Sequence, residues 1–157
     1  MLAIRSLRHL SAVAMLGATL TAQPSPAQRP PFRFHYAAKI ICGTSREVLR
    51  GAVPQLYWTV INIHNPADSV AEFQKSLVVT LPPGRQQPER PRVISGDSLG
   101  PNLALASDCT DLRIRNPKLP AFFDGFVLID SNVSLDVVAV YTVPGGVDVE
   151  QVAERVR

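Results

Sequence analysis

The sequence has few of the residues on which most metal and redox sites depend. Only two of its 157 residues are cysteine and three are histidine. No Cys-x-x-Cys or His-x-His pair occurs, and no loop carries a dense set of acidic residues. The local patterns of zinc sites, strong calcium sites and dithiol redox centres are therefore missing. We predict no metal ligands, no cofactor and no catalytic residues.

Long apolar runs and helical periodicity are also scarce. After the first 27 residues no segment has eighteen uninterrupted apolar residues, so we predict no integral membrane segment in the mature chain. No stretch repeats apolar residues at helical spacing for long enough to form a substantial helix. Instead, 14 prolines and 9 glycines separate short runs rich in Val, Ile and Leu. This mixture favours short strands joined by stiff turns.

The first residues have the pattern of a secretory signal peptide. Arg5 and Arg8 precede an apolar run that is too short to anchor the chain, and small and turn-forming residues follow it. We predict cleavage after Ala27, with Ala22 as the alternative, and hence a secreted or periplasmic protein.

Loss of that segment nearly neutralises the chain. It removes two arginines and no acid, which leaves 14 basic and 13 acidic residues. Apart from a Pro-rich stretch at 82–92, the basic residues are scattered. We therefore expect no nucleic-acid partner and no attraction to acidic lipid.

The remaining chain predicts an all-β, single-domain β-sandwich of seven to eight short, mainly antiparallel strands. Residues 28–33 form a Pro-rich lead-in, 34–152 the sandwich and 153–157 a frayed tail. The predicted strands are 34–42, 55–64, 75–82, 91–95, 101–109, 122–130 and 134–143, with an edge strand at 147–149. A helical turn at 110–115 begins at a cap on Thr110 or Asp111. The runs 122–130 and 134–143 predict a hairpin at the centre of the sheet.

The apolar positions of these strands predict the interior of the sandwich. The expected core residues are Ile40, Ile61, Ile63, Val79, Val127, Ile129, Val138 and Val140.

Cys42 and Cys109 both lie in the predicted exported part. An even pair in an oxidising compartment predicts a disulfide, which would join the first strand to the middle of the chain. Closing a loop of this length contributes about 4 kcal/mol in the chain-entropy model. Two free, buried thiols are the alternative.

The stretch "VISGDSLGPN" contains Gly-Asp-Ser-Leu, which opens the active site of the GDSL esterases. Those enzymes need a histidine base near the C-terminus, usually in Asp-x-x-His. Here every histidine precedes Ser98, and no Asp-x-x-His occurs. A serine without a base is a poor nucleophile. We therefore interpret Gly96, Asp97 and Gly100 as a turn, with a GDSL-like hydrolase as the disfavoured alternative.

The other candidate residues lie on the first strand, on the second strand or in the loop after it. His35 and His64 could ligate a metal together with nearby aspartates, although a histidine at a strand end more often bonds to a turn. The candidate binding residues are Trp58, His64, Asn65 and Asp68. For Trp58 a place in the core is the better interpretation. The segment 65–68 and the stretch 82–92 are predicted recognition loops.

Five segments carry a resemblance: "YAAKIICG", "INIHNP", "DC", "FFDGFVLIDS" and "LDVVAVYT". Together they resemble a group of small exported bacterial β proteins of unknown function, from about Tyr36 to Val152. In that group the last two segments read like "KGFVVIxSxxxLDVVAVYT", and Asp124 stands here where lysine is common. The strand plan is also similar to that of the sensory-rhodopsin-transducer type of β-sandwich. That likeness implies a non-enzymatic module that oligomerises and engages a ligand or partner.

These observations lead to one expected function. The protein should be an exported, non-catalytic module that binds a protein partner or a small ligand, and it could form a homo-oligomer through edge strands. The competing hypothesis is a small secreted enzyme, either metal-dependent through His35 and His64 or a hydrolase using Ser98.

Overall fold

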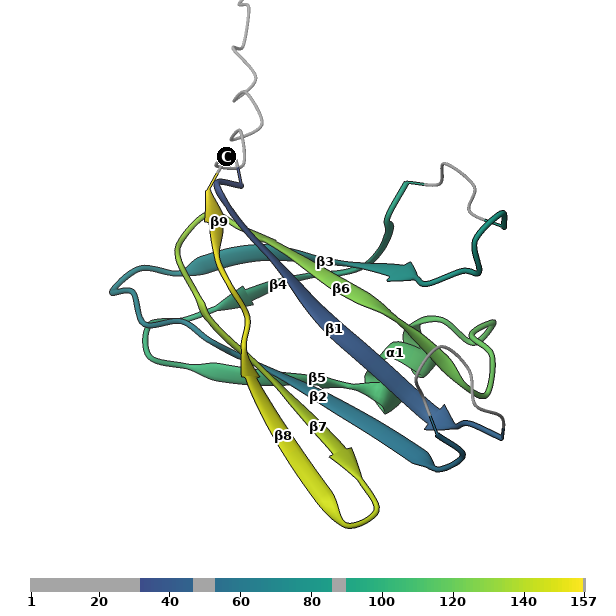
Figure 1. Ribbon diagram of the computed structural model, residues 1–157. Coiled ribbons are helices and arrows are strands. Elements are labelled where there is room, and N and C mark those ends of the chain that lie inside the picture. The colour runs from purple at the N-terminus through teal and green to yellow at the C-terminus, as the bar shows by residue number, and fades with distance from the viewer. Residues whose placement is uncertain (1–31, 47–52, 86–89, 157) are drawn as a thin grey trace, which may run out of the picture.

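Nine strands and one short helix make up the described part of the chain. The computed structural model describes residues 32–46, 53–85 and 90–156 (Figure 1). The elements are β1 (Phe34–Thr44), β2 (Leu56–His64), β3 (Ala71–Val79), β4 (Arg92–Leu99), β5 (Ala104–Asp108), α1 (Cys109–Arg115), β6 (Phe123–Ser131), β7 (Asp136–Val143), β8 (Gly146–Gln151) and β9 (Arg155–Val156).

The strands form one antiparallel sheet that folds over into two layers. One layer has the order β4-β3-β6-β1, with β9 pairing to the start of β1, and the other has the order β5-β2-β7-β8. The layers are continuous where Gly43 and Thr44 of β1 pair with Tyr57 and Leu56 of β2. Figure 1 shows the two layers facing each other, with α1 near the far end of β1. The predicted all-β sandwich is confirmed.

The core lies between the layers and takes alternate residues from each strand. In β1, Tyr36, Ala38, Ile40 and Cys42 are buried while the residues between them are half buried. Five of the predicted core residues are fully buried. They are Ile40, Ile61, Ile63, Val127 and Ile129. Val79 is half buried and packs against the core. The alternation places one face of each strand inward, as expected for a sandwich.

The prediction for β7 was wrong by one residue. Val137 and Ala139 are fully buried, whereas Val138 and Val140 are only half buried. A one-residue shift in register moves every side chain of a strand to the other face. Because the run is apolar at all four positions, its sequence does not show which set faces inward.

The predicted hairpin of the two most apolar strands does not form. β6 pairs with β1 and β3, while β7 pairs with β2 and β8. The four-residue connection therefore crosses from one layer to the other, and Leu135 within it is buried. Each strand is central in its own layer, as predicted, so both are flanked on two sides and need little polar surface.

Three further local predictions differ from the structure. β3 begins at Ala71, four residues before the predicted start, and the Gly-Asp-Ser-Leu stretch lies inside β4 rather than in a turn. The turn follows at Gly100 to Asn102, where Asn102 has φ 54°. The tail was predicted to fray, yet Val156 of β9 pairs with Phe34.

The predicted signal peptide, residues 1–27, and most of the lead-in lie outside the described residues. The predicted edge strand is present as β8. In the described residues no helix has the length and apolar character needed to cross a membrane.

Candidate functional site

A cavity of about 290 Å³ opens at the end of the sandwich near α1. Its walls come from the end of β3, the start of β4 and the segment that follows α1. The lining residues are Leu77, Val78, Val79, Leu81, Arg90, Pro91, Arg92, Asn116 and Leu119. Its volume falls close to the lower limit of about 300 Å³ that is typical of small-molecule sites. We name it the β3–α1 pocket.

The β3–α1 pocket is mainly apolar and carries two cations. Five of its lining residues are aliphatic, and Val78 and Leu81 are 38% and 43% exposed. Arg90 and Arg92 are both exposed, and neither forms an ion pair with any other described residue. No acidic residue lines the pocket. An anionic group would therefore meet two arginines that have no ion-pair partner among the described residues, beside an apolar wall.

Asn116 is the one buried polar side chain among the lining residues, at 1% exposed. Its backbone N–H donates to the carbonyl of Leu112 at 2.9 Å, and its side-chain amide donates to the same carbonyl at 3.4 Å. Its Oδ1 atom is buried and accepts no hydrogen bond from the described residues. A buried acceptor without a partner costs about 1–3 kcal/mol. The cost would be relieved by a ligand that brings an N–H or O–H donor.

The first turn of α1 is fixed in two ways. Cys109 forms a disulfide with Cys42 of β1, with Cα atoms 5.6 Å apart, so the predicted bridge is present. Asp108 caps the helix: its Oδ1 accepts from the backbone N–H groups of Thr110 at 2.8 Å and Asp111 at 2.9 Å. The predicted caps, Thr110 and Asp111, were wrong because the carboxylate that reaches these orphan N–H groups lies before them.

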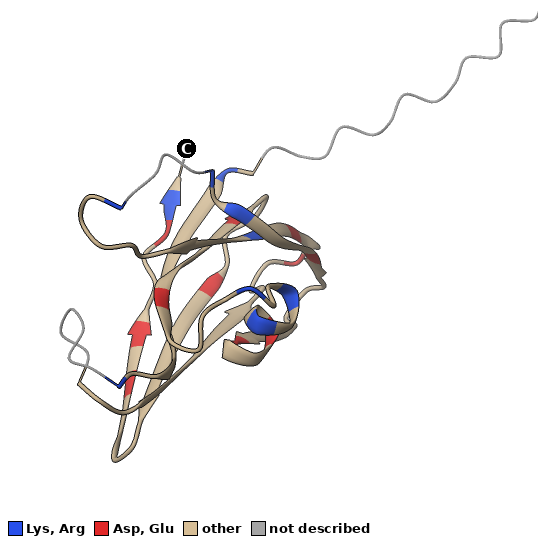
Figure 2. Ribbon diagram, turned by 90° about the vertical axis from the view of Figure 1, so that its right-hand side faces the viewer, with Lys and Arg blue, Asp and Glu red and all other residues tan. Residues whose placement is uncertain are grey.

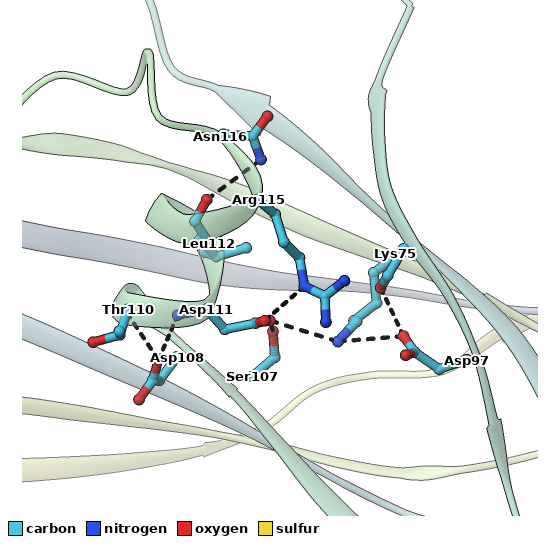
Figure 3. Close-up of polar contacts among 10 residues, drawn as sticks. Lys75, Asp97, Ser107, Asp108, Thr110, Asp111, Leu112, Arg115 and Asn116 are labelled. Carbon is cyan, nitrogen blue, oxygen red and sulfur yellow. Dashed lines mark hydrogen bonds and ion pairs between the residues drawn. The ribbon is translucent and has the colours of Figure 1, made fainter.

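A buried lysine ties the middle of α1 to the sheet (Figure 3). Lys75 of β3 has a side chain only 3% exposed, and its ammonium lies 3.4 Å from Asp97 of β4 and 3.8 Å from Asp111 of α1. Arg115 also reaches Asp111, at 2.6 Å. We name these four residues the Lys75 cluster. It holds α1 against β3 and β4, and the next residue after Arg115 is Asn116.

Hydroxyl groups complete the polar contacts of the Lys75 cluster. Ser107 donates to Asp111 at 2.8 Å and Ser95 donates to Asp97 at 2.6 Å. Burial alone raises the pKa of Asp111, but the hydrogen bonds from Arg115 and Ser107 and the charges of Lys75 and Arg115 outweigh it and hold that pKa below its usual value of 3.8. Asp111 is thus held as a carboxylate, as its contacts require.

The two histidines lie apart in separate pairs with aspartates of neighbouring strands. His35 of β1 contacts Asp130 of β6, and His64 of β2 lies 2.9 Å from Asp136 of β7. Within residues 32–46, 53–85 and 90–156, no group of three or more His, Cys, Asp or Glu residues could hold a metal. The Nε2 atom of His35 is buried with no partner among these residues.

Asn65 closes the loop after β2. It is fully buried, and its amide donates to the carbonyls of Ser69 at 2.8 Å and Leu99 at 2.9 Å. Its Oδ1 accepts from the N–H of Ala67 at 3.1 Å. These bonds use the side chain within the fold, where it joins the ends of β2 and β4.

The remaining sequence candidates lie on strands or in the same loop. Asp68 is exposed, while Trp58 is half buried and packs against the core. Ser98 is exposed on β4 opposite Glu72 of β3. None of these residues lines the β3–α1 pocket.

Sequence reasoning found one part of the pocket and missed the others. The predicted recognition loop 82–92 supplies Arg90, Pro91 and Arg92, while 86–89 lie outside the described residues. Asn116 and Lys75 were not selected. A lysine at the head of the apolar run "KSLVVT" was the one available signal for a buried charge.

Acidic and basic residues are mixed over the described part of the chain. Figure 2 shows acidic and basic positions interspersed, and α1 itself carries both. The local excess of positive charge at the pocket therefore comes from Arg90 and Arg92 and not from the overall balance.

Comparisons with known proteins give a distant structural likeness. No family model matches the chain, and no curated protein matches it. A solved structure, the crystal structure of Thermotoga maritima 1070, aligns with 80% of this chain and 94% of that chain, at 12% sequence identity and a TM-score of 0.48.

Proposed function

We propose that the protein is an exported, non-catalytic β-sandwich module that binds a small amphipathic anion in the β3–α1 pocket. The ligand has an apolar body, one anionic group and one N–H or O–H donor. The observation that carries the proposal is that Asn116, whose buried Oδ1 accepts no hydrogen bond from the described residues, is one of the residues that line a mainly apolar cavity. Native proteins leave few such atoms without a partner.

Each part of the pocket supports one part of that ligand. The aliphatic walls favour an apolar body, since burial of apolar surface contributes roughly 25 cal/mol per Å². Arg90 and Arg92 favour the anionic group, and Asn116 accepts from the donor. The small volume favours a small ligand over a protein chain at this pocket.

Export is supported by the N-terminal pattern and by the disulfide. Disulfides persist mainly in oxidising compartments, and the bridge between Cys42 and Cys109 fixes the helix that precedes the pocket residues Asn116 and Leu119. A secreted or periplasmic location therefore agrees with the bond on which the proposed site depends.

The test uses 8-anilinonaphthalene-1-sulfonate, which combines aromatic rings, a sulfonate and an amine N–H. We expect saturable binding to one site on the folded protein, followed by fluorescence. Asn116→Leu removes the acceptor and Arg92→Glu reverses one charge, and each should weaken binding at least tenfold. Arg85→Glu is the matched control, because Arg85 is exposed and does not line the pocket.

Thermal unfolding of each variant separates loss of the site from loss of the fold. If folded Asn116→Leu and Arg92→Glu bind the probe as tightly as the unmodified protein, the β3–α1 pocket is not its site and the proposal fails. Absence of saturable binding to the unmodified protein has the same consequence.

A further inference from the structure

The β7–β8 hairpin presents an edge strand that the core does not cover. All six residues of β8 are exposed, and Val147 and Val149 are 66% and 61% exposed. In the described residues β8 pairs with β7 on one side only. Figure 1 shows this hairpin extending beyond the rest of its layer. Native sheets usually shorten, cover or charge such an edge, because its free backbone groups can pair with another chain.

The two faces of β8 differ in chemistry. Val149 lies opposite Val140 of β7, which in turn lies opposite Val60 of β2. A row of three valines therefore crosses the outer face of this layer and ends at the free edge. Asp148 and Glu150 lie on the other face, and β8 contains no basic residue.

One backbone N–H on this edge bonds to a side chain and not to another strand. The N–H of Val149 donates to the Oδ1 of its neighbour Asp148 at 2.9 Å. A strand N–H that bonds to its neighbour's side chain is not used in the ladder with β7 and points away from it. An incoming carbonyl oxygen could take this N–H and release the Asp148 carboxylate for another partner.

We propose that β8 accepts a strand from another protein, in which basic and apolar residues alternate. The apolar residues would extend the row of Val60, Val140 and Val149, and the basic residues would pair with Asp148 and Glu150. This is strand addition to a sheet edge, in which backbone bonds give affinity and alternate side chains give selectivity. The inference does not depend on the β3–α1 pocket.

The charges of β8 argue against a second copy of this chain as the occupant. Antiparallel pairing of two β8 strands centred on Val149 would place Asp148 of each copy opposite Glu150 of the other. Like charges directly opposite each other destabilise a strand pair. A basic strand would experience attraction at the same two positions.

The test is fluorescence anisotropy with a labelled heptapeptide that alternates Val with Lys, and with a matched peptide that alternates Val with Glu. We expect the basic peptide to bind at least tenfold more tightly than the acidic one. A basic peptide with N-methylated backbone amides should bind at least tenfold more weakly, because it cannot form the ladder.

Asp148→Lys and Glu150→Lys should each weaken binding of the basic peptide at least threefold. Glu72→Lys is the control, since it makes the same charge change at an exposed position on β3, in the other layer. The proposal is overturned if the basic peptide does not bind, if both peptides bind equally, or if the control weakens binding as much as the β8 variants. Self-association of the unmodified protein through β8, detected by light scattering, would also overturn it.

Discussion

The ammonium of Lys75 lies 3.4 Å from the carboxylate of Asp97 on the adjacent strand, with only 3% of the lysine side chain exposed. Lys75→Met should therefore leave Asp97 with the Ser95 hydroxyl but with no ion-pair partner among the described residues, and should destabilise the fold by about 1–3 kcal/mol. Urea unfolding measures this change. Lys75→Met combined with Asp97→Leu should recover most of the loss, because no unpaired charge remains.

A second lysine pair serves as the control for that prediction. Lys39 and Asp124 are closer, at 2.8 Å, but their side chains are 31% and 25% exposed. Solvent screens such a pair, so Lys39→Met should cost less than about 1 kcal/mol. If Lys39→Met costs more than Lys75→Met, burial does not control the strength of these contacts.

Alkaline pH should destabilise the fold through Tyr36. Its hydroxyl accepts from the buried N–H of Leu135 at 2.7 Å and donates to Glu154 at 2.5 Å. Burial, together with the hydrogen bond to Glu154, raises its pKa from 10.0 to about 12. Because the folded pKa exceeds the unfolded one, this stabilisation is complete below pH 10 and is lost as pH rises to about 12.

Two measurements follow this loss from about pH 9 to about pH 13. Tyrosinate absorbance reports the ionisation, and circular dichroism reports the fold. At neutral pH, Tyr36→Phe should lower the free energy of unfolding by about 1–3 kcal/mol, because it leaves the Leu135 N–H unpaired. The urea midpoint of this variant should fall accordingly. The variant should also lose less stability than the unmodified protein above pH 10. An identical pH dependence in the two proteins would contradict the role of Tyr36.

Reduction of the disulfide should destabilise the whole domain. The bond joins residues 67 positions apart, and removal of a native bridge from a small domain typically costs about 2–5 kcal/mol. We expect a lower urea midpoint for Cys42→Ala combined with Cys109→Ala. A reductant should lower the midpoint of the unmodified protein and leave that of the variant unchanged.

Gly43 should tolerate alanine much less well than Gly145. Both have positive φ, 96° and 87°, so each substitution carries about 1–2 kcal/mol of backbone strain. A Cβ at Gly43 would also lie 1.9 Å from the carbonyl oxygen of Ala121, whereas a Cβ at Gly145 meets nothing within 4 Å. Gly43→Ala should therefore lower the melting temperature far more than Gly145→Ala, and equal effects would contradict the predicted clash.

Alternation and turn residues were enough to predict the layered fold and most of its strands. Ile40, Ile61 and Ile63 each lie at inward positions of clearly alternating strands. Alternation gives no information where both faces of a strand are apolar. The run around Val138 is of this kind, so neither its register nor its partner strands could be inferred from the sequence. Strand pairing depends on contacts between residues that are far apart in the sequence, and a local sequence pattern does not show such contacts.

The candidate site was less predictable than the fold for a related reason. Asn116 becomes distinctive only because the fold buries it beside Leu77 of β3, a residue from another part of the chain. Lys75 is likewise ordinary in sequence and unusual only in its burial. Arg90 and Arg92 could be assigned to a recognition loop because Pro-rich segments commonly lie at the surface.

The bridge at the first residue of α1 also sets the order in which the molecule can mature. Before oxidation the helix is held by its cap, by the charges around Lys75 and by the buried side chain of Leu112, but the segment that carries Asn116 lacks its covalent attachment to β1. If the β3–α1 pocket binds as proposed, we expect newly made chains to bind the ligand fully only after an oxidant has formed the disulfide.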